Sequence, residues 1–440
     1  MPCPHTSNIL EQFDESRRSF MRKALAVGGA SALSACVDRQ GMPDVPQGRG
    51  AAALPARQHA WGDFLARDAH GNTILPTFQL VLLFDYAGDG PPSEAERRSV
   101  QQAFDTVHRA YEWGNGQANP YSGDGRLIEG ALFMMGYSRR YFERFDADLP
   151  DSVDLPDPAD TIDELDEESE PQPHDAALVA ASDYAQVLLA IEQALYGNLD
   201  ELNGVSVAGT LDGTLELADR RTGFKGRGYV AEKLDTEEVP RQSPSAMGYK
   251  SGFRGNQAPE DKVSIAAGPF TDGSTLHLSR VAFNLDSWYN DNTEPERINR
   301  MFSPKHDHED VGDVGDFLAG DSGITRDLAD ATERHAEQRG VVGHTQKTAR
   351  ARDDSFDPRI LRRSEGVSID LNVPSLNFSS VQRGVEEFVK TRKAMNGDDL
   401  DLEDPNSGIL DDIDVLNRGN YLLPPRDAIA LPTPEGAGPT

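Results

Sequence analysis

The order of two patterns near residue 80 constrains the fold most strongly: a long apolar strand pattern is followed directly by an amphipathic helix pattern. The run from Thr77 to Tyr86, TFQLVLLFDY, is dominated by residues that favour strands. The sequence PPS at 91–93 then precedes apolar residues at helical spacing from Glu94 to about Trp113. A strand this apolar is buried, and the helix after it must cover one face of its sheet.

Strand and helix patterns alternate in the same way along the rest of the chain. We expect strands over 130–137, 176–181, 205–209, 211–222, 274–285 and 376–381, and helices over 139–145, 183–196, 286–290, 295–302 and 384–395. The second half therefore echoes the first. This repetition predicts an α+β fold of two ferredoxin-like units, each an antiparallel sheet with helices.

Composition divides the chain into segments around these two units. We place the first unit at 75–225 and the second at 226–430, with a Gly-, Pro- and Ala-rich flexible tether at 37–74. Within the first unit, 149–174 is rich in Pro and acids, and it has no Lys or Arg between Pro150 and Asp175. A solvated loop is favoured there, because the residue spacing of a calcium-binding EF-hand is absent.

Residues 1–36 have the pattern of an export signal. SRRSFMRK at 16–23 resembles a twin-arginine motif, and the apolar run after it, 24–33, is too short to span a membrane as a helix. LSAC at 33–36 resembles a lipobox, which implies lipidation of Cys36 and attachment to the outer face of the cell membrane. The alternative is a basic amphipathic start of a cytoplasmic protein.

The charge balance excludes some partners. The 440 residues include 74 acidic and 43 basic side chains, for a net charge of −31. Such a chain repels phosphates, so we expect no nucleic-acid partner. Because the acids are spread along the chain, they indicate a hydrated surface suited to high salt, and so a halophilic source, rather than an acidic tail or a cation store. Two cysteines cannot build a disulfide framework.

The segment 343–364 carries the residues best suited to chemistry. His344 is followed, after enough chain to cross a loop and return on a neighbouring strand, by Arg362 and Arg363. His344 and Arg362 are therefore expected on opposite sides of one pocket. A neutral imidazole suits a metal ion, and a fixed guanidinium suits a developing negative charge on oxygen.

This segment, GH and then RILRR after a variable stretch, resembles the proximal-histidine segment of the dye-decolourising (DyP-type) haem peroxidases. The resemblance implies that the cofactor is haem b and that His344 is the axial ligand of its iron. It also implies that Arg362 is the arginine over the distal face. The neighbouring Arg363 is assigned to a haem propionate or an acidic side chain.

A second stretch resembles another motif of the same family. GYKSG, from Gly248 to Gly252, is similar to its GxxDG motif, and Asn256 matches the asparagine that follows. The resemblance implies that both glycines let the backbone approach the macrocycle closely. The distal aspartate of the family falls on Ser251, whose hydroxyl can position a water but cannot accept a proton near neutral pH.

The similarity extends over roughly 75–430 and implies that haem lies between the sheet and helices of the second unit. DGSTL at 272–276, Arg280, LDSW at 285–288 and the segment 376–388 resemble later parts of the family's fold, the last being its final strand and helix. Arg280 is assigned to the haem propionates.

The resemblance predicts oxidation of a reducing substrate by hydrogen peroxide, with a role in envelope haem or iron handling. Electrons from the substrate are expected to travel through Trp288 or Tyr289. One alternative is a haem-binding envelope lipoprotein without efficient turnover, because Ser251 replaces the aspartate. Another is an acidic envelope protein with this fold and no cofactor. The reducing substrate and a homo-oligomeric state are left open.

A rival metal site is suggested by KHDHED at 305–310. It offers two imidazoles and three carboxylates, which suit Zn²⁺ or Mn²⁺. On a strand, His306 and His308 would lie on one face. Because no established ligand spacing supports it, an acidic surface segment is favoured.

Overall fold

The computed structural model describes residues 45–436 apart from 115–129, 228, 235–237, 251–252, 322, 372, 398–399 and 401–407. The predicted export signal with Cys36 lies outside the described residues, as do Ser251 and Gly252. The described part of the expected tether, 45–74, is packed rather than flexible. Its Trp61 and Leu65 are buried against the sheet, and it contains β1 (Ala66–Arg67) paired with β2 (Thr73–Ile74).

The first unit has the four strands of a ferredoxin-like sheet, in the spatial order β9-β3-β6-β4. Its strands are β3 (Phe78–Tyr86), β4 (Leu132–Tyr137), β6 (Ala176–Ser182) and β9 (Leu215–Phe224), and its two long helices are α3 (Glu94–Ala110) and α6 (Ala185–Leu195). Numbered within the unit, the strand order is fourth, first, third, second. Helix α3 follows the first strand and α6 follows the third, as the alternating patterns predict.

Local sequence explains where α3 begins and what it covers. The Ser93 side chain accepts the Glu96 backbone N–H, and the Glu96 carboxylate accepts the Ser93 N–H at 2.7 Å, which completes a capping box. Phe104 of this helix is fully buried and stacks on Phe133 of β4 at 5.8 Å between ring centres. Both helices of the unit thus lie directly on one face of its sheet.

The second unit repeats the first. Its strands are β10 (Ser274–Phe283), β11 (Leu361–Ser368), β12 (Ser375–Gln382) and β13 (Ile413–Leu423), in the order β13-β10-β12-β11, and α13 (Val385–Asn396) follows the third strand. The order is again fourth, first, third, second, so the predicted duplication of an antiparallel α+β unit is confirmed. The expected last strand and helix, 376–388, are β12 and the start of α13; the last long strand is β13.

The two units join edge to edge and close into a ring of strands. Val367 pairs with Phe224 at one junction, and Leu422 pairs with Tyr137 at the other. At the first junction a Cβ on Gly366 would lie 2.9 Å from the Cα of Gly223, so both strands need glycine there. Apolar residues from both units fill the space inside the ring.

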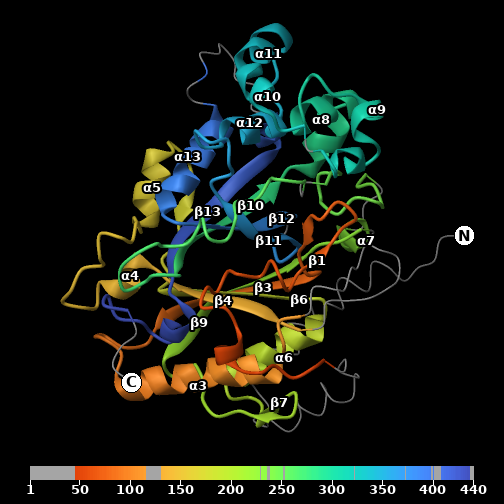
Figure 1. Ribbon diagram of the computed structural model, residues 1–440. Helices are drawn as coiled ribbons and strands as arrows, with labels where there is room; N and C mark the ends of the chain where they lie inside the picture. The colour runs from red at the N-terminus through yellow and green to blue at the C-terminus, as the bar shows by residue number, and fades with distance from the viewer. Residues whose placement is uncertain are drawn as a thin grey trace, which may run out of the picture.

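The largest difference between the units is the connection from their first strand to their second. In the second unit, 284–360 forms a group of helices beyond one end of the strands (Figure 1). These are the π-helix η2 (Ser287–Asp291), α8 (Glu294–Met301), α9 (His308–Val311), η3 (Asp316–Leu318), α10 (Arg326–Asp330), α11 (Thr332–Arg339) and α12 (His344–Arg350). This excursion carries His344.

The acidic segment 149–174 is not a solvated loop. It contains α5 (Pro158–Glu164) and β5 (Glu170–Pro171), and β5 pairs in parallel with β13. Glu167 lies between these elements and reaches two arginines of the second unit. Paired carboxylates explain why so acidic a segment can pack against the body of the protein.

The remaining short elements lie at the edges of the two units. They are η1 (Ala51–Ala53), α4 (Arg139–Phe142), β7 (Glu201–Leu202), β8 (Val205–Ser206), α7 (Tyr229–Leu234), η4 (Gly408–Asp412) and η5 (Arg426–Ala428). Within the described part of the chain, no helix is both long and apolar enough to cross a membrane.

Candidate functional site

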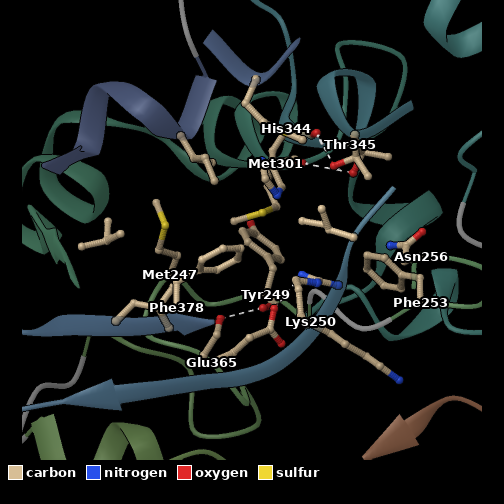
Figure 2. A pocket seen from close by; sticks show the side chains of 18 of the residues that line it. Met247, Tyr249, Lys250, Phe253, Asn256, Met301, His344, Thr345, Glu365 and Phe378 are labelled. Carbon is tan, nitrogen blue, oxygen red and sulfur yellow. Dashed lines mark hydrogen bonds and ion pairs between the residues drawn. The ribbon is translucent and has the colours of Figure 1, made fainter. Parts of the chain in front are cut away.

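A cavity of about 360 Å³ lies between the outer face of the second unit's sheet and the helices α8, α12 and α13. This volume is in the range of small-molecule and cofactor sites. Much of its wall is apolar, including Met247, Phe253, Met301, Phe302, Phe378 and Phe388. Figure 2 shows His344 and Glu365 entering this pocket from different sides.

The glycine before His344 explains how the histidine reaches the pocket. A Cβ on Gly343 would lie 2.1 Å from the carbonyl oxygen of Phe302, so the start of α12 is pressed against the end of α8. The Gly343 N–H donates to Oε1 of Gln346 at 3.0 Å, which secures the first turn. His344 is the first residue of α12 and lines the cavity.

His344 is held as a neutral imidazole. Burial, together with the charges of the nearby Arg362 and Lys347, lowers its pKa to about 3. Its Nδ1 is enclosed and has no hydrogen-bond partner among the described residues. An imidazole that stays uncharged throughout the physiological pH range keeps a lone pair for a metal ion.

The sheet side of the pocket presents an arginine and a carboxylate together. In a regular strand Arg362 and Glu365 would face opposite sides, but β11 has a bulge between Arg362 and Ser364 that brings both into the cavity. Nη1 of Arg362 lies 2.6 Å from Oε1 of Glu365, and Nζ of Lys225 lies 3.0 Å from its Oε2.

Electrostatics keep this carboxylate ionised. Burial by itself would raise the pKa of Glu365, but Arg362 and Lys225 outweigh burial and hold the pKa at about 2. His344 and Glu365 are close enough for each to affect the pKa of the other. Sequence reasoning missed Glu365 and Lys225, although the lone acid after the arginine pair was a usable signal.

The described lining of the pocket is basic, in contrast to the whole chain. It includes two acids, Asp68 and Glu365, and eight basic residues: Lys225, Arg227, Lys250, Arg352, Arg359, Arg362, Arg392 and Arg418. Four of these cations pair with carboxylates outside the lining: Arg227 with Asp316, Arg359 with Glu387, and both Arg392 and Arg418 with Glu167. Apolar walls bordered by cations suit an apolar ligand that carries carboxylates.

At one end of the pocket, two lining arginines share a carboxylate that lies behind them. Glu167 bridges the Nε atoms of Arg392 and Arg418, each at 2.6 Å. Arg418 also lies over the ring of Phe388, which stacks on His277 with 3.6 Å between ring centres. The acidic segment 149–174 therefore supplies a carboxylate to the pocket wall.

Arg363, assigned to a haem propionate or an acidic side chain, and Arg280, assigned to the propionates, both lie away from the pocket, and Arg363 meets an acidic side chain. Arg363 faces the inside of the strand ring, where its Nε donates to the His59 carbonyl at 2.9 Å and its Nη2 pairs with Glu260 at 2.5 Å. Arg280 is on the same inner side, because its neighbours Ser279 and Val281 line the cavity and successive residues of a strand face opposite sides. The structure gives neither arginine a place at the pocket.

The described part of the GYKSG motif lies at the pocket wall. Gly248 has φ +89°, a left-handed conformation that favours glycine, and its neighbours Met247 and Tyr249 line the cavity. Asn256 also lines it, and its buried Oδ1 has no partner among the described residues.

Trp288 and Tyr289 lie directly behind the pocket wall. Nε1 of Trp288 donates to the Met247 carbonyl at 3.0 Å, and the Tyr289 hydroxyl donates to the Ala246 carbonyl at 2.8 Å. Both accepting residues line the cavity. Trp288 is fully buried, so of the two only Tyr289 reaches toward the surface.

The rival metal segment 305–310 does not gather its ligands. His306 bonds Ser303 Oγ at 2.8 Å, whereas His308 starts α9 and pairs with Glu294 at 2.9 Å. The two histidines therefore do not share a strand face. In the part of the chain that the structure describes, no group of three His, Cys, Asp or Glu side chains is arranged to hold a metal.

Solved structures show the class of fold. A DyP-type peroxidase from Bacteroides thetaiotaomicron aligns with TM-score 0.51 and 11% identity, over 84% of this chain and 98% of that one. A variant of DypB from Rhodococcus jostii, in complex with heme, aligns with TM-score 0.51 and 14% identity, over 86% and 99%. The encapsulated DyP-type peroxidase from Mycobacterium smegmatis aligns with TM-score 0.50 and 12% identity, over 84% and 98%. The protein has the fold of the DyP-type peroxidases.

Family comparison assigns the chain more narrowly. A model of the family DUF7405, a family of unknown function, matches residues 76–425, and the chain belongs to that family. No curated protein matches it.

Proposed function

We propose that the protein binds haem in the pocket of its second unit and catalyses peroxidase chemistry there. The observation that carries this proposal is the arrangement of His344 on the helix side opposite Arg362 on the sheet side, across an apolar cavity. The residues present fit the group: a neutral imidazole with an enclosed, unpartnered Nδ1 suits iron, and the cations that border the cavity suit carboxylates.

Each part of the pocket has a role in this proposal. His344 would hold the iron, and basic side chains of the lining would hold the carboxylates of the macrocycle. When bound, haem supplies the redox chemistry. Arg362 offers a fixed positive charge to an oxygen that becomes negative, and the apolar walls exclude water, which strengthens that interaction.

The substrates follow from the class of chemistry. We assign hydrogen peroxide as the oxidant and an unidentified reducing substrate as the electron donor. The similarity to proteins named DyP-type peroxidases, one of them in complex with heme, supports this assignment through the fold. Tyr289, at the pocket wall and partly exposed, is the better placed of the two aromatic residues for electron entry.

A second candidate function is haem binding without efficient turnover. It is favoured by Ser251, which stands where a proton-accepting aspartate is expected. Haem-loaded protein that consumes peroxide no faster than free hemin would support this candidate. Peroxide-dependent oxidation of a dye well above that level would support the peroxidase.

We also propose that the protein is exported by the twin-arginine route and anchored through lipid on Cys36. The proposal rests on the sequence of residues 1–36 alone. In the native host, Cys36→Ser is expected to release the protein from membranes into the medium. Unchanged membrane attachment of this variant would contradict the anchor.

The test of the proposed function is an absorption spectrum of the protein after addition of hemin. We expect the unmodified protein to show a Soret band. In the His344→Ala variant this band should be lost or strongly shifted. His308→Ala is the matched control, because His308 lies on the same excursion but outside the cavity. No Soret band in any of the three proteins would overturn the proposal.

A further inference from the structure

The pocket contains a carboxylate that no motif assigns. Glu365 projects from β11 beside Arg362 and faces the same cavity as His344. The side chain is about nine-tenths buried, and each carboxylate oxygen has a separate cationic partner. Stability alone does not account for a buried charge this closely held, because apolar residues of similar size are often at least as stable.

We propose that Glu365 is the residue that takes up and returns the proton of the peroxide substrate. This inference rests on the proposed function. Ser251 stands where the acid is expected in the GYKSG motif and cannot accept a proton near neutral pH. Glu365 offers a carboxylate from a different element, the sheet strand that also carries Arg362.

The other acid of the described lining is not available for this role. Asp68 belongs to the turn between β1 and β2, where its oxygens accept the backbone N–H groups of His70 and Asn72 at 2.9 Å. The same carboxylate pairs with Lys250 at 2.7 Å. Apart from Lys250, its partners are groups of its own turn, whereas both partners of Glu365 are side chains of the cavity.

The proposed step moves one proton and conserves all atoms. The Glu365 carboxylate accepts the proton of one peroxide oxygen and returns it to the other, which leaves as water when the O–O bond breaks. Haem, the co-reactant of the proposed function, would supply the two electrons when bound. Arg362 stabilises the negative charge that develops on the departing oxygen. The low pKa of Glu365 keeps its carboxylate ionised, which is the form that can accept a proton, and makes its hold on that proton brief.

A readout other than turnover tests this role. Near neutral pH, potassium cyanide is present mainly as HCN, which must lose its proton to bind ferric haem. We expect Glu365→Gln to slow cyanide association about 10²–10⁴-fold in haem-loaded protein. Glu192→Gln is the matched control: Glu192 is buried and paired with Arg220 at 2.9 Å, but it lies in the first unit.

A second variant separates proton transfer from a structural role. Lys225→Met removes one of the two cations that hold Glu365 ionised, so the pKa of Glu365 must rise. The rate of cyanide association falls at low pH as Glu365 becomes protonated. In Lys225→Met this fall, the acid limb of the pH profile, should occur at higher pH. A carboxylate that only stabilises the pocket would leave the position of this limb unchanged.

The outcomes distinguish this inference from the proposed function. If Glu365→Gln binds haem with a normal Soret band and its rate of cyanide association is unchanged, the role of Glu365 alone is overturned. A limb that does not move in Lys225→Met would overturn it as well. Absence of haem binding in the unmodified protein would overturn the proposed function and the role of Glu365 together.

Discussion

The two units have the same strand order but use it differently. In the first unit, α3 and α6 lie directly on the sheet, and the layer between them is apolar and closed. In the second, the excursion 284–360 and α13 surround a cavity lined by charged side chains. The two units therefore share a fold but not a site. The site is formed by the longer connection in the second unit.

The charges follow the same division. In the second unit, Glu365 and Glu167 each hold two cations at the pocket wall. Side chains this deep are costly to desolvate and are stable only as complete networks. The stability of the first unit is thus expected to depend mainly on apolar packing, and that of the second on its ion pairs.

The largest effect is expected from a cavity in the first unit. Phe104→Ala should lower the free energy of unfolding by about 3–5 kcal/mol, because Phe104 is fully buried in a closed layer. Phe388→Ala should cost less, since Phe388 already borders the cavity. Urea unfolding of both variants measures the difference. Equal losses would contradict the contrast between a closed and an open layer.

The next largest loss of stability is expected from removing the ion pairs between Glu167 of the acidic segment and two arginines of the second unit. Glu167→Gln removes the carboxylate that Arg392 and Arg418 share, so we expect a loss of about 3 kcal/mol. Glu164→Gln is the control, because Glu164 pairs with Lys393 at the surface and should change stability by under about 1 kcal/mol. Hydrogen exchange should show the loss of protection in β13 and α13.

Acid should weaken the second unit through Glu365. Its pKa is lowered from 4.5 to about 2, so its contribution, about 3 kcal/mol, is complete above pH 4.5 and lost as pH falls toward 2. Unfolding measured across this range should show a steeper decline in the unmodified protein than in Glu365→Gln. Parallel curves would show that the ion pairs of Glu365 do not stabilise the fold.

A smaller effect is expected at Gly343, the residue that precedes α12 within the excursion 284–360. Gly343→Ala places a Cβ against the Phe302 carbonyl, and relief of the clash should cost about 1–3 kcal/mol. Because His344 is the next residue, haem affinity should fall more than stability. Hemin titration and thermal unfolding of the same variant test this. A loss of stability with unchanged hemin affinity would contradict the positioning of His344 by this contact.

The smallest effect is expected at the surface of the first unit. Ser93→Ala removes the N-cap of α3 and should cost about 1 kcal/mol. Hemin binding should be unchanged, since α3 lies far from the cavity lining. Thermal unfolding and hemin titration measure both quantities. A change in hemin affinity would mean that the two units are more tightly coupled than their packing indicates.

Sequence patterns were sufficient where local periodicity decides structure. The strand β3, the helix α3 and the repetition of strands and helices follow from apolar spacing and capping residues. The expectation that His344 and Arg362 share one pocket came instead from their separation along the chain and from the family resemblance, and both residues line the cavity. A turn at Gly248 also follows, because its φ of +89° suits glycine.

Tertiary pairing alone decided which side chains reach the cavity. The bulge in β11 depends on its register with β12, and it brings Glu365 beside Arg362. Successive residues of a strand face opposite sides, so Arg363 beside Arg362, and Arg280 between Ser279 and Val281, face the inside of the ring of strands. Local sequence determined the helices and strands of this protein, whereas long-range strand register and the packing of Glu167 determined the charges around its pocket.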